Sequence, residues 1–160
     1  MIILSIDPGV ERTGFAVFNK KGQQSFEYIF ADLIKTKKSI STSDRLKEIN
    51  DRLLKIIVKY KPKKIILERL FFFKNQKTVI SVAQAQGAIM LISSQQLIPI
   101  IFFTPLQIKQ IITGYGRADK KTIQKMLQLT LGYHKEILQD DVADAIACGL
   151  SYCYWNEDLA

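Results

Sequence analysis

An almost unbroken apolar run near the N-terminus constrains the fold of this chain more than any other feature. Residues Ile2 to Asp7 are nearly continuously apolar, so they predict a central β-strand that is covered on both sides. Asp7 and the following Pro8-Gly9 end the run, which places Asp7 at the carboxyl edge of a sheet. A second apolar run, Lys64 to Arg69, also closes on an acid, Glu68. Ligand sites of open α/β sheets lie beyond such strand ends.

The other patterns predict strands and helices that alternate after an initial three-stranded meander. No internal repeat or long linker divides the chain, so we expect a single domain over 1–160. Residues 114–117, with two glycines, are expected to be a flexible joint. The order predicts an α/β fold with a mixed five-stranded sheet and helices on both faces. The remaining strands are expected at 14–19, 24–34 and 98–103, and the helices at 44–60, 76–96, 105–113, 119–131 and 140–154.

The chain is basic, with 23 Lys and Arg against 15 Asp and Glu and a formal net charge of +8. Lysine-rich solvated surface explains such a balance, and so does a polyanionic partner bound through its phosphates. Charge alone does not choose between the two. No segment approaches the length of a membrane span, and the N-terminus lacks the basic flank of a signal peptide. Cys148 and Cys153 diverge on one predicted helix, so we expect reduced thiols and a cytoplasmic protein.

Four carboxylates stand where a core would otherwise be apolar. Asp7 and Glu68 end strands, and Asp141 and Asp144 lie three apart on a final helix that is otherwise apolar. Taken singly, each acid has an ordinary explanation: a turn cap, a pair with Arg12 or Arg69, or the favourable dipole at a helix N-terminus. If the segments meet, however, like charges gather where water is scarce and need a cation. Spacing alone does not exclude Asp140 from the set.

Carboxylate oxygens favour Mg²⁺, which prefers octahedral oxygen coordination. No cluster of Cys and His suggests zinc, and the one histidine, His134, is expected on the surface or in a loop. Two Mg²⁺ ions about 4 Å apart orient an attacking water and stabilise the leaving oxygen in phosphodiester cleavage. A basic chain with an acidic centre of this kind therefore points to a nuclease.

Blocks of residues along nearly the whole chain resemble the RuvC-type Holliday-junction resolvases, which have a ribonuclease H-like fold. Any one block is weak, but as an ordered set they are specific. The blocks are Ile6-Asp7-Pro8-Gly9 with Thr13-Gly14, Glu68 with Phe71 and Lys74-Asn75, Gln84-Ala85-Gln86-Gly87, Lys109-Gln110, Gly114-Tyr115-Gly116 with Lys120, and Asp141-Val142-Ala143-Asp144-Ala145.

The resemblance implies roles for individual residues. Lys109 and Lys120 match positions that contact the scissile region or nearby phosphates, although both also suit an ordinary helix surface. Phe71 matches an aromatic that stacks on bases of the opened junction, and Lys74-Asn75 follows it. Alternatively, the aromatics 71–73 plug the core, and the sequence does not say which of them is exposed. The four acids match the Mg²⁺ ligands and catalytic residues: Asp7, Glu68, Asp141 and Asp144, with Asp141 favoured over Asp140.

The resemblance also implies an activity and partners: a homodimer, built on the helix around 76–96, that makes paired symmetric nicks in four-way DNA junctions during recombination and repair. A branch-migration motor as a further partner, and Mn²⁺ in place of Mg²⁺, are left open. Arg69 departs from the family, where an uncharged polar residue is common. One alternative is a nuclease of the same fold that acts on RNA. Another is an ATP-binding domain of the actin and sugar-kinase type, in which Asp7-Pro8-Gly9 would cradle phosphate.

Overall fold

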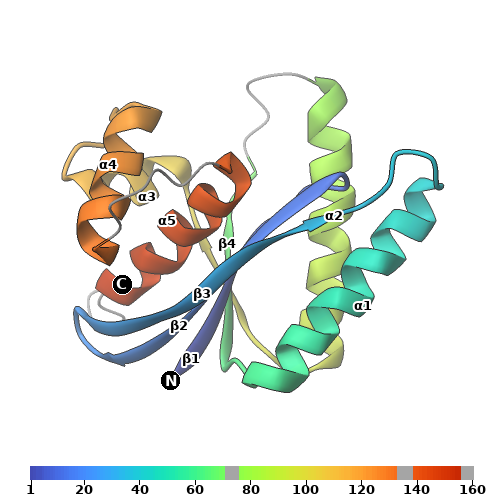
Figure 1. Cartoon of the computed structure of the whole chain (residues 1–160), viewed down its shortest axis with the longest axis horizontal. Coiled ribbons are helices and arrows are strands. Elements are labelled where there is room, and N and C mark those ends of the chain that lie inside the picture. The colour runs from blue at the N-terminus through green and yellow to red at the C-terminus, as the bar shows by residue number, and fades with distance from the viewer. Residues whose placement is uncertain (71–75, 133–138, 156–160) are drawn as a thin grey trace.

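The computed structural model describes residues 1–70, 76–132 and 139–155. Five strands form one sheet in the order β3-β2-β1-β4-β5, and five helices pack against it (Figure 1). The strands are β1 (Ile2–Asp7), β2 (Arg12–Gly22), β3 (Ser25–Lys35), β4 (Lys64–Glu68) and β5 (Ile100–Phe103). The helices are α1 (Thr42–Tyr60), α2 (Gln76–Gln95), α3 (Pro105–Thr113), α4 (Lys120–Leu131) and α5 (Asp140–Tyr154).

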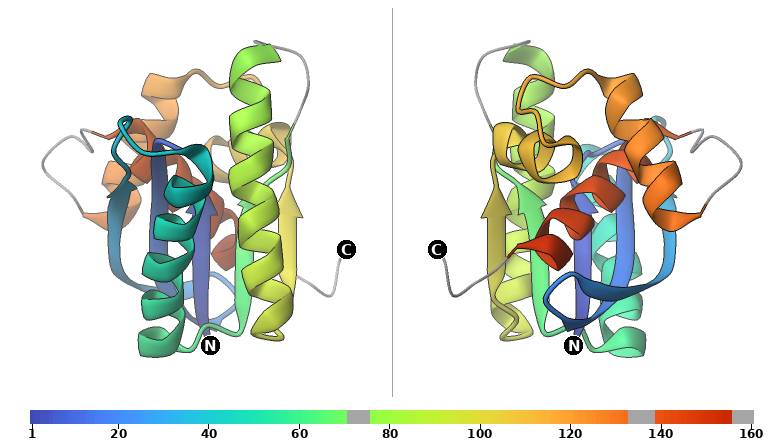
Figure 2. Two further views of the ribbon diagram at one scale, coloured as in Figure 1. Left: turned by 90° about the vertical axis from the view of Figure 1, so that its right-hand side faces the viewer. Right: turned by 90° about the vertical axis from the view of Figure 1, so that its left-hand side faces the viewer.

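The predicted mixed sheet with helices on both faces is confirmed. β2 runs antiparallel to β1 and β3, whereas β4 is parallel to β1 and β5 is parallel to β4. Figure 2 shows α1 and α2 in front of the sheet from one side, and α3, α4 and α5 in front of it from the other. The fifth strand starts two residues later than predicted. The reason is that the amide N–H of Ile98 donates a hydrogen bond to the carbonyl of Ser93, near the end of α2.

Side chains of the central strands alternate between two cores, as a pleated strand requires. Leu4 and Ile6 of β1 pack in the core under α1 and α2, whereas Ile3 packs in the core under α5. The same alternation places Ile66 of β4 under α5. Asp7 is four residues after Ile3, and Glu68 is two residues after Ile66, so each acid lies on the same face of its strand as the residue that packs under α5. Both acids therefore project toward α5.

Helix α5 is the most deeply buried helix of the described chain, and nearly all of its residues from Val142 to Cys153 are inaccessible. A glycine allows its close approach to the sheet. A Cβ on Gly149 would stand 2.4 Å from the ring of Phe18 and 2.5 Å from the hydroxyl of Ser5. Cys148 and Cys153 lie on this helix as buried, free thiols, as predicted. Within the described ranges, no helix has the length and apolar character needed to cross a membrane.

Candidate active site

Asp7 and Glu68 are neighbours at the carboxyl edge of the sheet. β1 and β4 pair in parallel with Ile6 opposite Leu67, so the next residue on each strand is one of the two acids. Both acids leave the same face of the sheet, the face that α5 covers. The sequence placed each of them at a strand end, and the strand register brings the two ends together.

The first turns of α5 bring Asp141 and Asp144 to the same edge. Asp7 is paired across the β1–β2 ladder with Gly14. A Cβ on Gly14 would stand 2.0 Å from the backbone carbonyl oxygen of Asp141, a separation that no side chain tolerates. The missing side chain of Gly14 thus provides the space in which the start of α5 meets the end of β1.

Burial and mutual repulsion raise the pKa values of three of the acids: Asp7, Glu68 and Asp144. Burial, with the nearby charges of Asp144, Glu68 and Asp141, raises the pKa of Asp7 to about 8. Burial and the charge of Asp144 raise the pKa of Glu68 to about 7, although Lys109 opposes the rise. The pKa of Asp144 is also raised, chiefly by burial. Buried carboxylates whose pKa values are raised in this way, above all Asp7 and Glu68, would be stabilised in their charged form by a bound cation.

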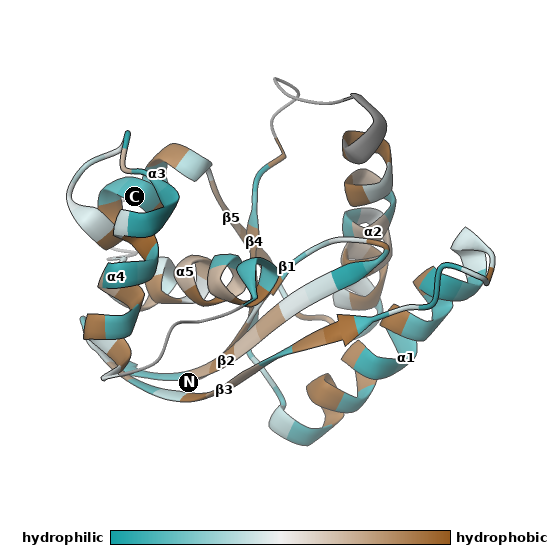
Figure 3. Cartoon of the chain, turned by 45° about the horizontal axis from the view of Figure 1, so that its top comes forward, coloured by the Kyte–Doolittle hydropathy of each residue, from teal (hydrophilic) through white to brown (hydrophobic). Residues whose placement is uncertain are grey.

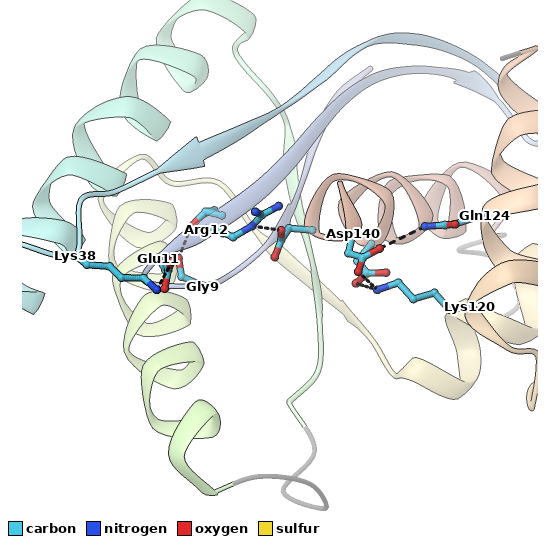
Figure 4. Close-up of polar contacts among 10 residues, drawn as sticks. Gly9, Glu11, Arg12, Lys38, Lys120, Gln124 and Asp140 are labelled. Atoms are coloured by element: carbon cyan, nitrogen blue, oxygen red, sulfur yellow. Dashed lines mark hydrogen bonds and ion pairs between the residues drawn. The ribbon is translucent and has the colours of Figure 1, made fainter. Parts of the chain in front are cut away.

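Two basic side chains pair with the acids in the first turns of α5. The Nε of Arg12 donates to Oδ2 of Asp141 at 2.6 Å, and the Nζ of Lys120 lies 3.1 Å from Oδ2 of Asp140 and 3.8 Å from Oδ2 of Asp144. Figure 4 shows Arg12 and Lys120 reaching the acidic turn from opposite sides. Among the residues that the structure describes, no three acid, His or Cys side chains are already gathered as a metal site.

A cavity of about 330 Å³ opens beside the acids between β4, α3, α4 and α5. Its charged lining consists of Glu68, Asp144, Lys109 and Lys120, and its apolar lining comes from α3, α4 and α5. A second hollow of about 260 Å³ is lined by Asp7, Glu68 and Arg69 among others. Negative charge thus lies at the sheet edge, with lysines on the wall facing it. This arrangement suits a phosphodiester held next to a cation-binding centre.

The predicted site residues differ in how the structure places them. Asp7, Glu68, Asp141 and Asp144 gather at one edge, and Lys109 and Lys120 line the adjoining cavity. Asp140 has a side chain that is 65% exposed and pairs with Lys120, so it lies outside the cluster around Asp7. The predicted or discussed residues that lie outside the described residues are Phe71, Phe72, Phe73, Lys74, Asn75 and His134.

Two features of the site were not predicted. Arg12 was considered as a partner of Asp7 or Glu68, but it bonds to Asp141, 129 positions away. Gly14 was noted only within a motif, and its role as the contact point for α5 needs the tertiary structure. Arg69, the departure at the position after Glu68, is exposed, and its guanidinium lies 5.9 Å from the ring centre of Phe102.

The RuvC family model, described as crossover junction endodeoxyribonuclease RuvC, matches residues 3–152. The chain belongs to the RuvC family. The RuvC of Petrotoga mobilis is 44% identical over 156 residues, which cover 98% of this chain and 94% of the relative. The RuvC of Halothermothrix orenii is 42% identical over 156 residues, which cover 98% and 93% of the two chains.

Solved RuvC structures agree with this placement. The structure of Thermus thermophilus RuvC in complex with Holliday junction substrate has a TM-score of 0.88 and 26% identity, and the match covers 96% of this chain and 93% of that one. A second Thermus thermophilus RuvC structure has a TM-score of 0.86 and 25% identity, with 96% and 94% covered. The predicted ribonuclease H-like fold is therefore confirmed. The family's nucleases are metal-dependent, which agrees with the raised pKa values of the buried acids Asp7 and Glu68.

Proposed function

We propose that this chain, as one nuclease domain, resolves four-way DNA junctions by hydrolysing phosphodiester bonds in two strands of like polarity. The observation that carries the proposal is the cluster of Asp7, Glu68, Asp141 and Asp144 at the sheet edge of a RuvC family member. The Thermus relative, which has the same fold and 26% identity, was solved with Holliday junction substrate. The proposed role is in homologous recombination and DNA repair, in the bacterial cytoplasm where the chromosome lies.

The four acids fit Mg²⁺, and we propose two ions per site. All the donors are carboxylate oxygens, the ligands that Mg²⁺ prefers. Burial and neighbouring carboxylates raise the pKa of Asp7 to about 8 and that of Glu68 to about 7, and a bound cation would favour the charged form of both. When bound, such ions activate water and stabilise the oxygen that leaves phosphorus. Mn²⁺ has the same ligand preference and is a candidate substitute.

The protein's own side chains have separate tasks in this proposal. Asp7 and Glu68 hold the cations from the rigid sheet edge, and Asp141 and Asp144 complete the ligand set from α5. Arg12 fixes one carboxylate oxygen of Asp141, which leaves the other oxygen free to bind. Lys120, beside Asp144, is placed to bind the phosphate that is cut.

We propose two sets of DNA contacts beside the acids. Lys109 and Lys120 line the cavity beside Glu68, and we assign them to phosphates of the cleaved strand. We propose that Phe71 stacks on an unpaired base and that Lys74 and Asn75 bind the backbone next to it. Replacing Phe71 with Ala should then reduce cutting more than binding. Loss of the fold in that variant would support the alternative in which the aromatics fill the core.

We propose that the chain forms a homodimer through α2. That helix buries Ala85 and Ile89 against the core, yet exposes a stripe of apolar and small residues on its outer face: Ile80, Ala83, Gly87, Met90 and Leu91. Brown, hydrophobic residues accordingly recur along α2 in Figure 3. An apolar stripe of this kind marks an interaction site, and two copies related by a two-fold axis would place two identical sites against the near-symmetric junction. A branch-migration motor is a further candidate partner.

The dimer is tested by sedimentation of the wild type and of Leu91→Glu. We expect a dimer that the variant dissociates, with Lys55→Glu on α1 as a matched charge control that stays dimeric. A monomeric wild type would overturn the assignment of α2.

The activity is tested by incubating the protein with a mobile four-way DNA junction, linear duplex and an RNA–DNA hybrid, with Mg²⁺ or EDTA. Paired, ligatable nicks found only in the junction with Mg²⁺ are the expected result. Cutting of RNA with no junction cleavage would favour the RNA-directed alternative.

A further inference from the structure

An exposed aromatic residue stands on the loop between α3 and α4, next to the cavity. Tyr115 is 61% exposed, and Leu106 of α3, which is 62% exposed, lies close to the same loop. The helices on either side of the loop carry Lys109 and Lys120, both of which line the cavity with Glu68 and Asp144. The loop therefore starts and ends at the wall of the acidic site.

Hydrogen bonds hold the backbone of this loop, which the sequence had suggested to be a flexible joint. The amide N–H of Tyr115 donates to the hydroxyl of Thr113 at 3.1 Å, and the carbonyl of Tyr115 accepts from the amide of Ala118 at 3.0 Å. The side-chain amide of Gln110 donates to the carbonyl of Gly114 at 2.8 Å. A ring carried on such a fixed backbone loses little conformational entropy when it binds a partner.

A glycine brings the loop backbone against an apolar side chain of α3. A Cβ on Gly116 would stand 2.7 Å from Cδ1 of Leu106, so the loop backbone rests directly on that side chain. Tyr115 precedes Gly116 in the chain and is exposed, as Leu106 is. These three residues are here called the Tyr115 platform.

The surroundings of the Tyr115 platform carry positive charge. Arg117, Lys120 and Lys121 are all exposed on the loop and the first turn of α4. The nearby acid, Asp119, is engaged in capping α4, where it accepts from the amide of Thr122 at 2.8 Å. An exposed aromatic ring among basic groups matches single-stranded nucleic acid, whose bases stack on rings while its phosphates pair with cations.

We propose that the Tyr115 platform stacks on an unpaired base of the junction strand that enters the carboxylate cavity. The proposal rests on the proposed function, because the strand must reach the acids to be cut. It adds a second stacking position to the one assigned to Phe71. Stacking carries no net charge, so its contribution to affinity does not depend on salt, unlike that of phosphate contacts.

The test compares Tyr115→Ala, Tyr115→Phe and Lys109→Ala in equilibrium binding to a four-way junction, in EDTA, over a series of KCl concentrations. We expect Tyr115→Ala to weaken binding about tenfold at every salt concentration, with the slope of log affinity against log salt unchanged. Tyr115→Phe should bind like the wild type, because the ring is retained. Lys109→Ala should lower the slope by about one. Leu129→Ala, an exposed apolar residue on α4, controls for loss of apolar surface alone.

A fluorescent base analogue, 2-aminopurine, placed at the crossover gives a second readout. Its emission should be quenched by stacking in the wild type and in Tyr115→Phe, and should rise in Tyr115→Ala. The proposal is overturned if Tyr115→Ala binds normally, as it would if the Tyr115 platform served a protein partner, or if Tyr115→Phe is as weak as Tyr115→Ala. A wild type that binds junction no better than duplex would instead refute the proposed function.

Discussion

Gly14 of β2 and Asp141 of α5 touch backbone to backbone, with 2.0 Å between the position of a Gly14 Cβ and the Asp141 carbonyl oxygen. Because Gly14 lies opposite Asp7 in the β1–β2 ladder, this contact sets the distance between the sheet-borne acid and the helix-borne acids. The acids of the sheet and of α5 can therefore meet because Gly14 has no side chain.

Replacing Gly14 with Ala should therefore damage the site. The added methyl group would push the start of α5 outward, at a cost of about 1–3 kcal/mol in the free energy of unfolding, and cleavage should fall more than junction binding. Thermal unfolding and single-turnover cleavage measure the two effects. Gly22→Ala is a matched control, since its nearest neighbour would be the Cβ of Ser25 at 3.9 Å. Equal cleavage by Gly14→Ala and the wild type would show that the contact is dispensable.

Stability without metal should depend on pH in a defined direction. The folded chain keeps the proton of Asp7 up to a pH of about 8, whereas the unfolded chain releases it near 3.8. The corresponding values for Glu68 are about 7 and 4.5. The folded state therefore binds more protons than the unfolded state between these limits, and the free energy of unfolding should fall as pH rises from about 4 to about 8.

Urea denaturation in EDTA at several pH values in this window measures that fall. Mg²⁺ should restore stability at the alkaline end, because cation binding replaces the lost protons. Asp7→Asn removes the group with the larger shift, so its stability should depend less on pH than that of the wild type. A wild type whose stability rises steadily across the window would contradict the shared buried environment of the acids.

Two adjacent lysines on α4 should behave differently. Lys120 lies 3.8 Å from Asp144 and lines the cavity, whereas Lys121 is exposed and does not line it. We expect Lys120→Ala to reduce the cleavage rate by about 100-fold, since it removes a charge placed at the cut phosphate. Lys121→Ala should leave the cleavage rate of bound substrate nearly unchanged. Rates measured with saturating enzyme separate this effect from binding, and similar losses in both variants would argue against a specific role for Lys120.

Much of the fold could be predicted because its signals are local. The apolar run ending at Asp7 identified the central strand, and the helix expected at 105–113 matches α3, which a full capping box on Thr104 starts. Helix α1 begins at Thr42 with Ser41 as its cap, two residues before the predicted start. Such boundary shifts arise because several neighbouring Ser and Thr residues offer equivalent caps.

The parts of the site that escaped prediction depend on long-range contacts. Nothing in the local sequence indicates that Arg12 pairs with Asp141 rather than with Asp7, which is much closer in the sequence. The pair forms only because α5 crosses β2 in the folded chain. Spacing likewise left Asp140 and Asp141 equivalent. The structure separates them because Asp141 contributes to the raised pKa of Asp7, whereas Asp140 points toward Lys120 and Gln124.

Asp7→Asn tests whether the acids at the sheet edge hold the cations needed for DNA cleavage. Asn keeps the shape of the side chain and removes the charge, so the fold and the basic surface should persist. On a four-way junction with Mg²⁺, we expect binding within a few-fold of the wild type and a cleavage rate reduced by at least about 100-fold. Asp32→Asn, on the distant strand β3, should cut normally. Normal cleavage by Asp7→Asn would contradict the claim.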